Sequence, residues 1–310
     1  MGELLALLSA TCFAASNVTI MRGAGAKGRD NGAFMSILLT AGIAGMIWIW
    51  QGLQQGWPSL DARSMLWFAG AGILTMFIGR VFLFASVQHL GAVRASAVKR
   101  LNPLFSVLLG VLLLGETLDL SMVIGMLLIG ASFAVLIRQS LKAHREEGRA
   151  AAPGDAPPAS WGSILRSLGF FYGPVSALAY AFGYVARKEG LTIMPDPAFG
   201  TMLGSAVGAL VFLLTAQFVA SYRTAVRSTF TTFNPWLFGA GILSSAGQLL
   251  YFLALGHSSI SRIAMISSME AFVTIFLTVL VTRSFRQINA TILLAAALGV
   301  TGTMFVVLRW

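Results

Sequence analysis

The residues best able to do chemistry in this sequence are charged side chains that interrupt apolar stretches. At positions 89–116, HLGAVRASAVKRLNPLFSVLLGVLLLGE, Lys99 and Arg100 are followed directly by Asn102 and Pro103. Cations inside an apolar span are costly, so they usually face a partner, a cavity or water. Charge beside a broken helix is also how membrane carriers build binding sites. We therefore expect Lys99 and Arg100 to have a functional role and Pro103 to be a hinge; the alternative is that the cations reach one membrane surface and Pro103 only kinks the helix.

Two further charged residues, Arg80 and Glu270, lie near the middle of apolar runs. A guanidinium there can hold a carboxylate or phosphate by paired hydrogen bonds, or it can bridge helices through backbone carbonyls. An ionised carboxylate at such a position is costly unless paired. Glu270 could couple solute movement to a proton gradient, or it could form a static ion pair with Arg80, Lys99 or Arg100. The sequence leaves both readings of Glu270 open.

The composition shows what kind of protein must position these groups. The chain has 310 residues, of which 57% are hydrophobic and only 10% charged. Soluble proteins carry about 25% charged residues, so this is a multi-pass membrane protein. Its net charge of +10 sits mainly in short loops, which indicates contact with lipid headgroups and not nucleic acid. The first apolar run has no basic residues before it, so we expect a retained helix and not a cleaved signal peptide.

Ten apolar segments can be read, each long enough or nearly long enough to cross a bilayer as a helix. They cover residues 3–21, 33–50, 65–88, 92–114, 120–137, 168–186, 198–219, 236–255, 261–282 and 288–308. A polar stretch rich in Ala, Pro and Gly separates the fifth segment from the sixth, and it reads as a mobile tether. The predicted organisation is a first repeat at 1–138, a linker at 139–167 and a second repeat at 168–310.

The two halves resemble one another. Phe84, His89 and Arg94 are spaced by fives, and Phe252, His257 and Arg262 repeat that spacing one half later; GAGIL at 70–74 recurs at 239–243. Because each half has an odd number of spans, the second half must be inverted in the bilayer. Inverted repeats are a hallmark of secondary transporters, which bind substrate at the repeat interface.

Aligning the halves pairs their buried polar residues. Lys99 corresponds to Ser267, Asn102 to Glu270 and Arg80 to Gln248, so these side chains should lie at similar depth about a pseudo-twofold axis. We expect them to line a central cavity, with other residues of the first and sixth segments completing its wall. The predicted substrate-binding residues are Arg80, Lys99, Asn102, Gln248, Ser267, Glu270, Asn17, Tyr180 and Tyr184. For Asn17 and the tyrosines, packing is the competing explanation.

Basic residues bear on orientation. Loops after the first, fifth, seventh and ninth segments hold twelve of them, whereas the opposite side holds only Arg63, Arg187, Lys188 and Arg309. By the positive-inside rule this bias places both termini outside the cytoplasm. Arg94 and Arg262 read as interface anchors, and Glu116 as a turn residue. Gly204 and Gly208 permit close helix approach, either inside the bundle or between protomers.

These features together resemble the EamA-type proteins of the drug/metabolite transporter superfamily. The resemblance rests on the two five-helix halves, the short hairpins after the third and eighth segments, and NPLFSVLLGVLLLGETL at 102–118. It implies an all-α membrane protein of ten helices in two inverted repeats, whose third, fourth, eighth and ninth helices line a central cavity. The second half departs from the pattern, with Ala271 at the proline position. The family more usually keeps both termini cytoplasmic, so the orientation stays open.

We therefore expect a secondary active transporter, not an enzyme, in the plasma membrane of a bacterial-type cell. It would move a small anionic or zwitterionic metabolite, such as an amino acid or organic acid, by alternating access with Glu270 as the proton-coupling residue. The alternatives are a carrier of a phosphorylated or lipid-linked sugar, and a non-transporting membrane subunit or sensor. We expect no cofactor, metal or nucleic-acid partner, since the sequence has no metal-ligand cluster and no phosphate-binding loop. The chain would act as a monomer or homodimer in the lipid bilayer.

Overall fold

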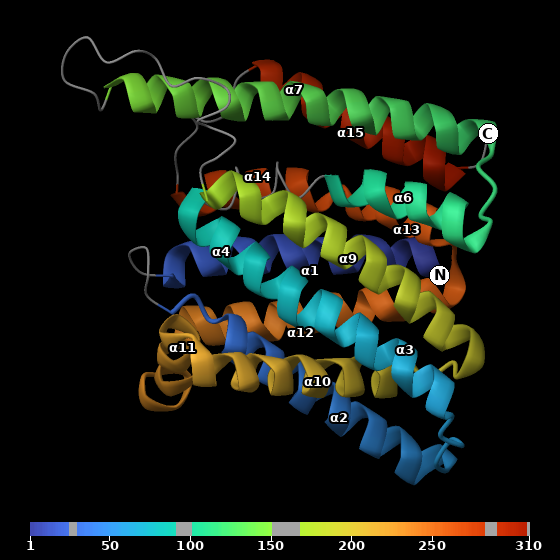
Figure 1. The fold of residues 1–310 in the computed structure, drawn as a ribbon. Coiled ribbons are helices and arrows are strands. Elements are labelled where there is room, and N and C mark those ends of the chain that lie inside the picture. Colours follow the sequence, from blue (N-terminus) through green and yellow to red (C-terminus); the bar gives the residue numbers. More distant parts are fainter. Residues whose placement is uncertain (25–29, 91–100, 151–167, 283–289, 309–310) are drawn as a thin grey trace.

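A computed structural model of the chain describes residues 1–24, 30–90, 101–150, 168–282 and 290–308 (Figure 1). Every regular element in these residues is a helix, and each of the ten expected segments contains one. The elements are α1 (Gly2–Gly23), α2 (Ala33–Gln55), α3 (Ala62–Gly72), η1 (Ile73–Gly79), α4 (Arg80–Leu90), α6 (Leu101–Leu114), α7 (Leu120–Ala150), α9 (Leu168–Ile193), α10 (Pro197–Phe218), α11 (Ala220–Thr231), α12 (Pro235–His257), α13 (Ile260–Ser267), α14 (Glu270–Thr282) and α15 (Ala290–Leu308). Six helical stretches in the described residues are long and apolar enough to cross a membrane, and three shorter apolar helices accompany them. The protein is an all-α, multi-pass membrane protein.

Polar residues mark the helix starts at the ends of the bundle. Asp61 accepts a hydrogen bond from the Ser64 N–H (2.8 Å), and Asp196 accepts one from the Phe199 N–H (2.8 Å). Asn234 caps α12 in the same way, just before a proline in the first helical position. Such caps satisfy N–H groups that the first turn leaves open, and proline lacks one of those groups. The sequence therefore sets these helix boundaries by local chemistry.

The two halves run in opposite directions and pack by a shared pattern. In Figure 1, α1 begins at the edge where both termini lie, whereas α9 begins at the opposite edge. The α1 helix packs on α12, and α9 packs on the α3–η1–α4 segment. Matching bonds join them: Ser9 Oγ donates to the Gly247 carbonyl and Ser176 Oγ to the Gly79 carbonyl, each at 2.7 Å. The separations from Ser9 to Ser176 and from Gly79 to Gly247 differ by only one residue, as an internal repeat requires.

Glycines allow the closest helix contacts inside the bundle. A side chain at Gly72 would overlap the backbone of Gly204, and one at Gly208 would press on Met76. Gly204 and Gly208 thus serve packing within the chain, which decides between the two explanations that the sequence left open. The α7–α15 pair packs together along the top of the bundle in Figure 1, and α2 lies along the bottom.

Two helix boundaries and one additional helix differ from the expectations. The α7 helix continues to Ala150, because residues 138–150 are mostly good helix formers such as Leu, Lys, Arg, Glu and Ala. This part of the expected linker is helical, while 151–167 lies outside the described residues. The α9 helix extends to Ile193, past the expected end at residue 186. An unexpected amphipathic helix, α11, occupies the connection between α10 and α12. The division into two repeats and a linker remains a prediction.

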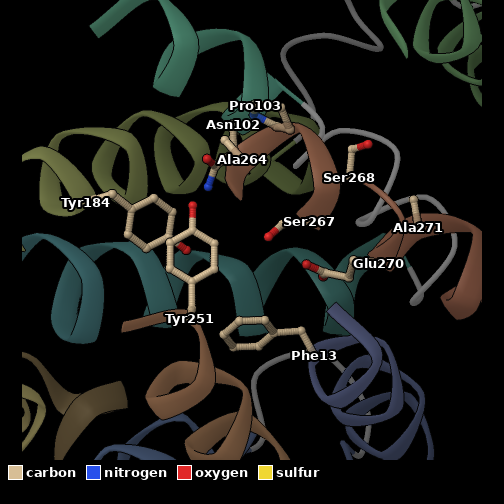
Figure 2. Close-up of a pocket in the computed structure, with 10 residues that line it drawn as sticks. All are labelled: Phe13, Asn102, Pro103, Tyr184, Tyr251, Ala264, Ser267, Ser268, Glu270 and Ala271. Atoms are coloured by element: carbon tan, nitrogen blue, oxygen red, sulfur yellow. The ribbon is translucent and has the colours of Figure 1, made fainter. Parts of the chain in front are cut away.

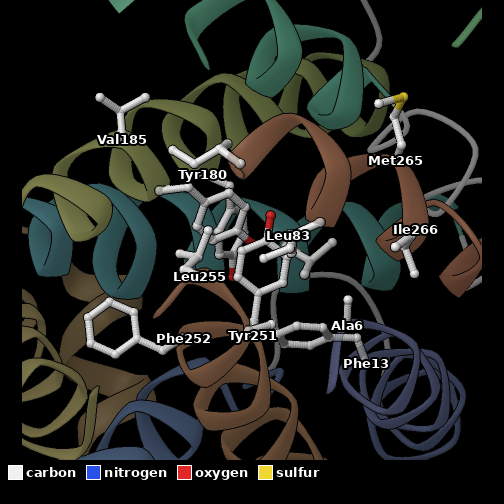
Figure 3. Packing of buried hydrophobic residues seen from close by; sticks show 14 of the residues in the cluster. Ala6, Phe13, Leu83, Tyr180, Val185, Tyr251, Phe252, Leu255, Met265 and Ile266 are labelled. Atoms are coloured by element: carbon white, nitrogen blue, oxygen red, sulfur yellow. The ribbon is translucent and has the colours of Figure 1, made fainter. Parts of the chain in front are cut away.

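The apolar core is built by both halves. Its labelled members in Figure 3 include Ala6 and Phe13 from α1, Leu83 from α4, Tyr180 from α9, and Tyr251, Phe252 and Leu255 from α12. Phe252 and Leu255 have no exposed surface. The aromatic side chains of this core border the polar site described next.

Candidate functional site

A cavity lies where six helices from the first and second halves meet. It is lined by Phe13 (α1), Asn102 and Pro103 (α6), Tyr184 (α9), Tyr251 (α12), Ala264 and Ser267 (α13), Ser268, and Glu270 and Ala271 (α14). Figure 2 shows the two tyrosines on one side of this space, with Ser267 and Glu270 facing them. Its volume is about 40 Å³. That is room for water, whereas sites for metabolite-sized ligands measure about 300–1,000 Å³.

Repeat-related residues meet in this cavity. Asn102 and Glu270 occupy equivalent positions in the predicted repeat, and Pro103 and Ala271 follow them. Of the residues expected to bind substrate, Asn102, Tyr184, Ser267 and Glu270 line the cavity. The structure brings these side chains together from segments more than 80 residues apart in sequence.

The ninth segment is broken at the cavity. The α13 helix ends at Ser267 and α14 begins at Glu270, with backbone bonds of the tighter three-residue kind between them: Ser268 N to Met265 O (3.1 Å) and Met269 N to Ile266 O (3.1 Å). Proline is absent from this stretch, so composition gave no signal for the break. Pro103 lies in α6, and the residues just before this helix, 91–100, lie outside the described residues. The described hinge-like feature is thus in the ninth segment, and a hinge at Pro103 remains a prediction.

Several polar atoms at the cavity have no protein partner. The hydroxyls of Tyr251, Ser267 and Ser268 are buried and make no hydrogen bond in the described structure. Buried polar groups are normally satisfied by protein or by ordered water. A solute or water in the cavity would supply the missing partners.

The carboxylate of Glu270 is held by the first helix. Asn17, buried in α1, donates from Nδ2 to Glu270 Oε1 at 2.8 Å. Asn17 therefore positions a residue of the wall without being part of the wall itself. Tyr184 and Tyr251 stack with ring centroids 4.1 Å apart, which makes one flat aromatic face of the cavity.

Arg80, Gln248 and Tyr180 are not part of this wall, contrary to expectation. Arg80 has no exposed surface, and its Nη1 donates to the Ser36 carbonyl (3.0 Å) and to Thr40 Oγ1 (2.6 Å). Gln248 lies next to it, with Oε1 3.5 Å from Arg80 Nη2. The π-helical turns of η1 immediately precede Arg80, and such turns change the face that the following residues present. The ring of Tyr180 packs 5.7 Å from that of Tyr184.

Arg187 was missed as a site residue. It was assigned to a loop on the outer side, but the longer α9 buries it to 1% exposure. Its Nη2 donates to Thr75 Oγ1 at 2.8 Å, and its guanidinium lies 4.7 Å from the centre of the Phe252 ring. The sequence did contain a usable signal: Tyr180, Tyr184 and Arg187 share one helical face. Lys99, together with Arg94 and Arg100, lies outside the described residues.

The edge that carries both termini is tied together by charged side chains. Glu116 accepts hydrogen bonds from the Ile260 N–H (2.7 Å), the Ser261 N–H (3.0 Å) and Ser261 Oγ (2.6 Å), so a residue of the first half caps α13. Lys188 Nζ donates to the Leu255 (2.7 Å) and Ser258 (3.0 Å) carbonyls at the end of α12.

Arg262 adds two longer ion pairs at this edge. Its guanidinium lies 3.7 Å from Glu3 Oε1 and 3.9 Å from Asp119 Oδ2. These contacts join the first helix, the turn before α7 and the start of α13. Together with the bonds of Glu116 and Lys188, these ion pairs form a polar layer at the terminus edge.

Comparison with known proteins agrees with this architecture. Residues 1–138 match the model of the EamA-like transporter family. The matched segment is less than half of the chain, so it shows a likeness to that family in the first half. The matched segment supplies Asn102 and Pro103 to the cavity.

Solved structures also resemble this chain in fold. Among them, 28 chains match. One, titled only as the crystal structure of a protein, is 20% identical with a TM-score of 0.65, covering 100% of this chain and 99% of that chain. At this identity the match shows the fold alone. No curated protein matches.

Proposed function

We propose that the protein is a secondary active transporter that moves a small anionic or zwitterionic metabolite across the plasma membrane by alternating access. The observation that carries the proposal is the convergence of repeat-related residues on one cavity beside a helix break. Inverted-repeat transporters bind substrate at such an interface, where interrupted helices expose backbone and side-chain polar groups. Asn102, Ser267 and Glu270 supply those groups here, and Tyr184 and Tyr251 supply an apolar face.

The described conformation fits a closed stage of the cycle. A cavity of about 40 Å³ is too small for an amino acid or organic acid, and contacts of Glu116, Lys188 and Arg262 bridge helices at the terminus edge. Transport then requires the two halves to move apart at one edge at a time. The break between α13 and α14 offers a bending point next to the site.

Glu270 is the proposed proton-coupling residue. Its carboxylate faces the cavity and is positioned by Asn17. Protonation would remove the negative charge that the Asn17 hydrogen bond stabilises. Because the same carboxylate faces the cavity, binding a proton there would change the affinity for substrate.

Uptake into proteoliposomes tests the proposal. Purified wild-type protein should accumulate solutes from a panel of amino acids and organic acids when a pH gradient is imposed. Glu270→Gln should abolish the dependence on the gradient, and Ser267→Ala should weaken apparent affinity. Asp61→Asn is the matched control, because it makes the same carboxylate-to-amide change at an exposed helix cap that Asn also satisfies.

The proposal is wrong if folded Glu270→Gln and Ser267→Ala proteins transport like wild type. It also fails if no gradient-driven flux of any solute in the panel is seen with wild-type protein.

A further inference from the structure

Two arginines are buried side by side, away from the cavity wall. Arg80 at the start of α4 has no exposed surface and Arg187 in α9 has 1%. Transferring a charged group out of water is costly, so buried charges are normally paired with an opposite charge. Here both charges have the same sign.

The partners that the structure gives them are neutral. Arg80 bonds to the Ser36 carbonyl, Ser36 Oγ and Thr40 Oγ1, and Arg187 to Thr75 Oγ1. Within the described part of the chain, no carboxylate forms an ion pair with either guanidinium. The Nε of Arg80 is buried and has no acceptor. The cluster thus has donors and positive charge in excess.

Gln248 makes the shortage of acceptors plain. One end of its amide lies 3.5 Å from Arg80 Nη2, and the other lies 3.1 Å from Arg187 Nη2 and also touches Arg187 Nη1. An amide has a single oxygen. If that oxygen faces Arg187, the NH₂ group faces Arg80, and if the amide turns over, the NH₂ group faces Arg187. One guanidinium is always left facing a donor.

The cluster lies directly behind the aromatic face of the cavity. Tyr184 precedes Arg187 by three residues on α9, and Tyr251 follows Gln248 by three on α12, so each tyrosine is about one helical turn from the cluster. The two rings stack on each other. Tyr180, labelled with Tyr251 in Figure 3, packs on Tyr184 in turn, with ring centroids 5.7 Å apart. Displacing the rings would join the cavity to the arginines.

We propose that Arg80 and Arg187 form an oxyanion-binding site that takes the carboxylate or phosphate of the transported solute. This inference rests on the proposed function and deepens it. A planar guanidinium binds either group through two parallel hydrogen bonds, and an anion between the two arginines would supply both the missing acceptors and the missing charge. The Gln248 oxygen would then accept from one guanidinium, and its NH₂ group would donate to the bound anion.

Thermal unfolding of the purified full-length protein in detergent tests the site without requiring transport. Sodium phosphate and sodium succinate are titrated at constant ionic strength made up with sodium chloride. A ligand that binds only the folded state raises its midpoint in a saturable way. We expect saturable stabilisation of wild type by at least one of the two salts, and the more effective salt identifies phosphate or carboxylate as the better ligand.

Variants locate the effect. Arg187→Gln and Arg80→Gln should lose the saturable response. Arg22→Gln should keep it, although Arg22 also bonds a backbone carbonyl and lies over an aromatic ring, because it sits at the bundle end.

Gln248→Glu covers the case in which the arginine variants do not fold. It places a fixed carboxylate of the same size between the two guanidiniums, so it should raise the midpoint without added anion and abolish the response to both salts. The inference is overturned if wild type shows no saturable response, if Arg187→Gln retains it, or if Gln248→Glu lowers the midpoint and still responds. If wild type shows Glu270-dependent uptake but no saturable response to either anion, this site is rejected while the proposed transport function stands.

Discussion

Glu116 caps α13, and this cap predicts that the stability effect of Gly110→Ala changes sign when Glu116 is also replaced. The carboxylate receives two backbone N–H groups from residues that are buried, Ile260 and Ser261. Losing a helix cap costs about 0.5–2 kcal/mol, and a hydrogen bond to a charged group contributes about 1.5–3 kcal/mol. Because Glu116 is itself only half-buried, we expect Glu116→Ala to lower the free energy of unfolding by about 2 kcal/mol.

Gly110 is the reason that this cap can form. A Cβ at Gly110 would lie 2.7 Å from Glu116 Oε2 and 2.8 Å from Ser261 Oγ. In wild type, Gly110→Ala would push the carboxylate away, and the lost bonds should outweigh the gain in helix propensity of about 1 kcal/mol. The expected net loss is about 1 kcal/mol. In the Glu116→Ala background only a serine hydroxyl must rotate, so the same substitution should raise stability by up to about 1 kcal/mol.

Denaturant unfolding in detergent, followed by circular dichroism, measures the four proteins of this double-mutant cycle. Gly130→Ala is the control, since a Cβ there meets nothing within 4 Å and should have one effect in both backgrounds. If Gly110→Ala has the same sign and size with and without Glu116, the carboxylate is not what excludes a side chain at Gly110, and the reasoning fails.

Two further predictions concern packing and closure. Gly72→Ala should lower the free energy of unfolding by about 3 kcal/mol or more, since the added methyl overlaps the backbone of Gly204. Gly70→Ala is the control, because a methyl there meets open space and should be neutral or stabilising. Thermal unfolding compares the two variants, and equal midpoints would contradict the contact between Gly72 and Gly204. Arg262→Gln removes only long ion pairs, so it should change stability by less than about 1 kcal/mol while loosening the terminus edge. In a protein without the native Cys12, a thiol reagent should label Ser267→Cys faster when Arg262→Gln is also present. An unchanged labelling rate would show that the polar layer at the terminus edge does not control access to the cavity.

The architecture could be predicted from the sequence because it depends on long-range averages. Ten apolar runs, an odd number in each half and matched spacings such as Phe84 and Phe252 are enough to specify an inverted repeat. The α11 helix was not predicted because it does not cross the membrane: its Arg223 and Arg227 removed it from any search for apolar spans. Helix ends were missed where polar residues, as in α7 beyond Arg138, continue a helix through good propensity alone.

The site was only partly predictable, since burial of a charge depends on neighbours that the sequence does not reveal. The pairing of Asn102 with Glu270 followed from the repeat, and the structure places both in one cavity. The position of Arg80 along its helix was equally clear from the sequence. The π-helical turns before it change the direction in which its side chain leaves the helix, and composition does not predict such turns. Arg187 was assigned to a loop because Arg-Lys-Glu usually ends a span. Only the packing of α9 against Thr75 and Phe252 shows it to be interior.

The contact between Arg80 and Gln248 joins two positions that are equivalent in the repeat. Equivalent positions that touch lie on the pseudo-symmetry axis, where two identical halves would set two copies of one residue against each other. Two glutamines could pair amide to amide, whereas two arginines would repel unless an anion lay between them, as proposed for Arg80 and Arg187. An unpaired arginine at this point therefore requires two halves that differ from each other, as the two halves of this chain do. Gene duplication followed by fusion would have allowed the symmetric bundle to acquire a lopsided charge at its centre.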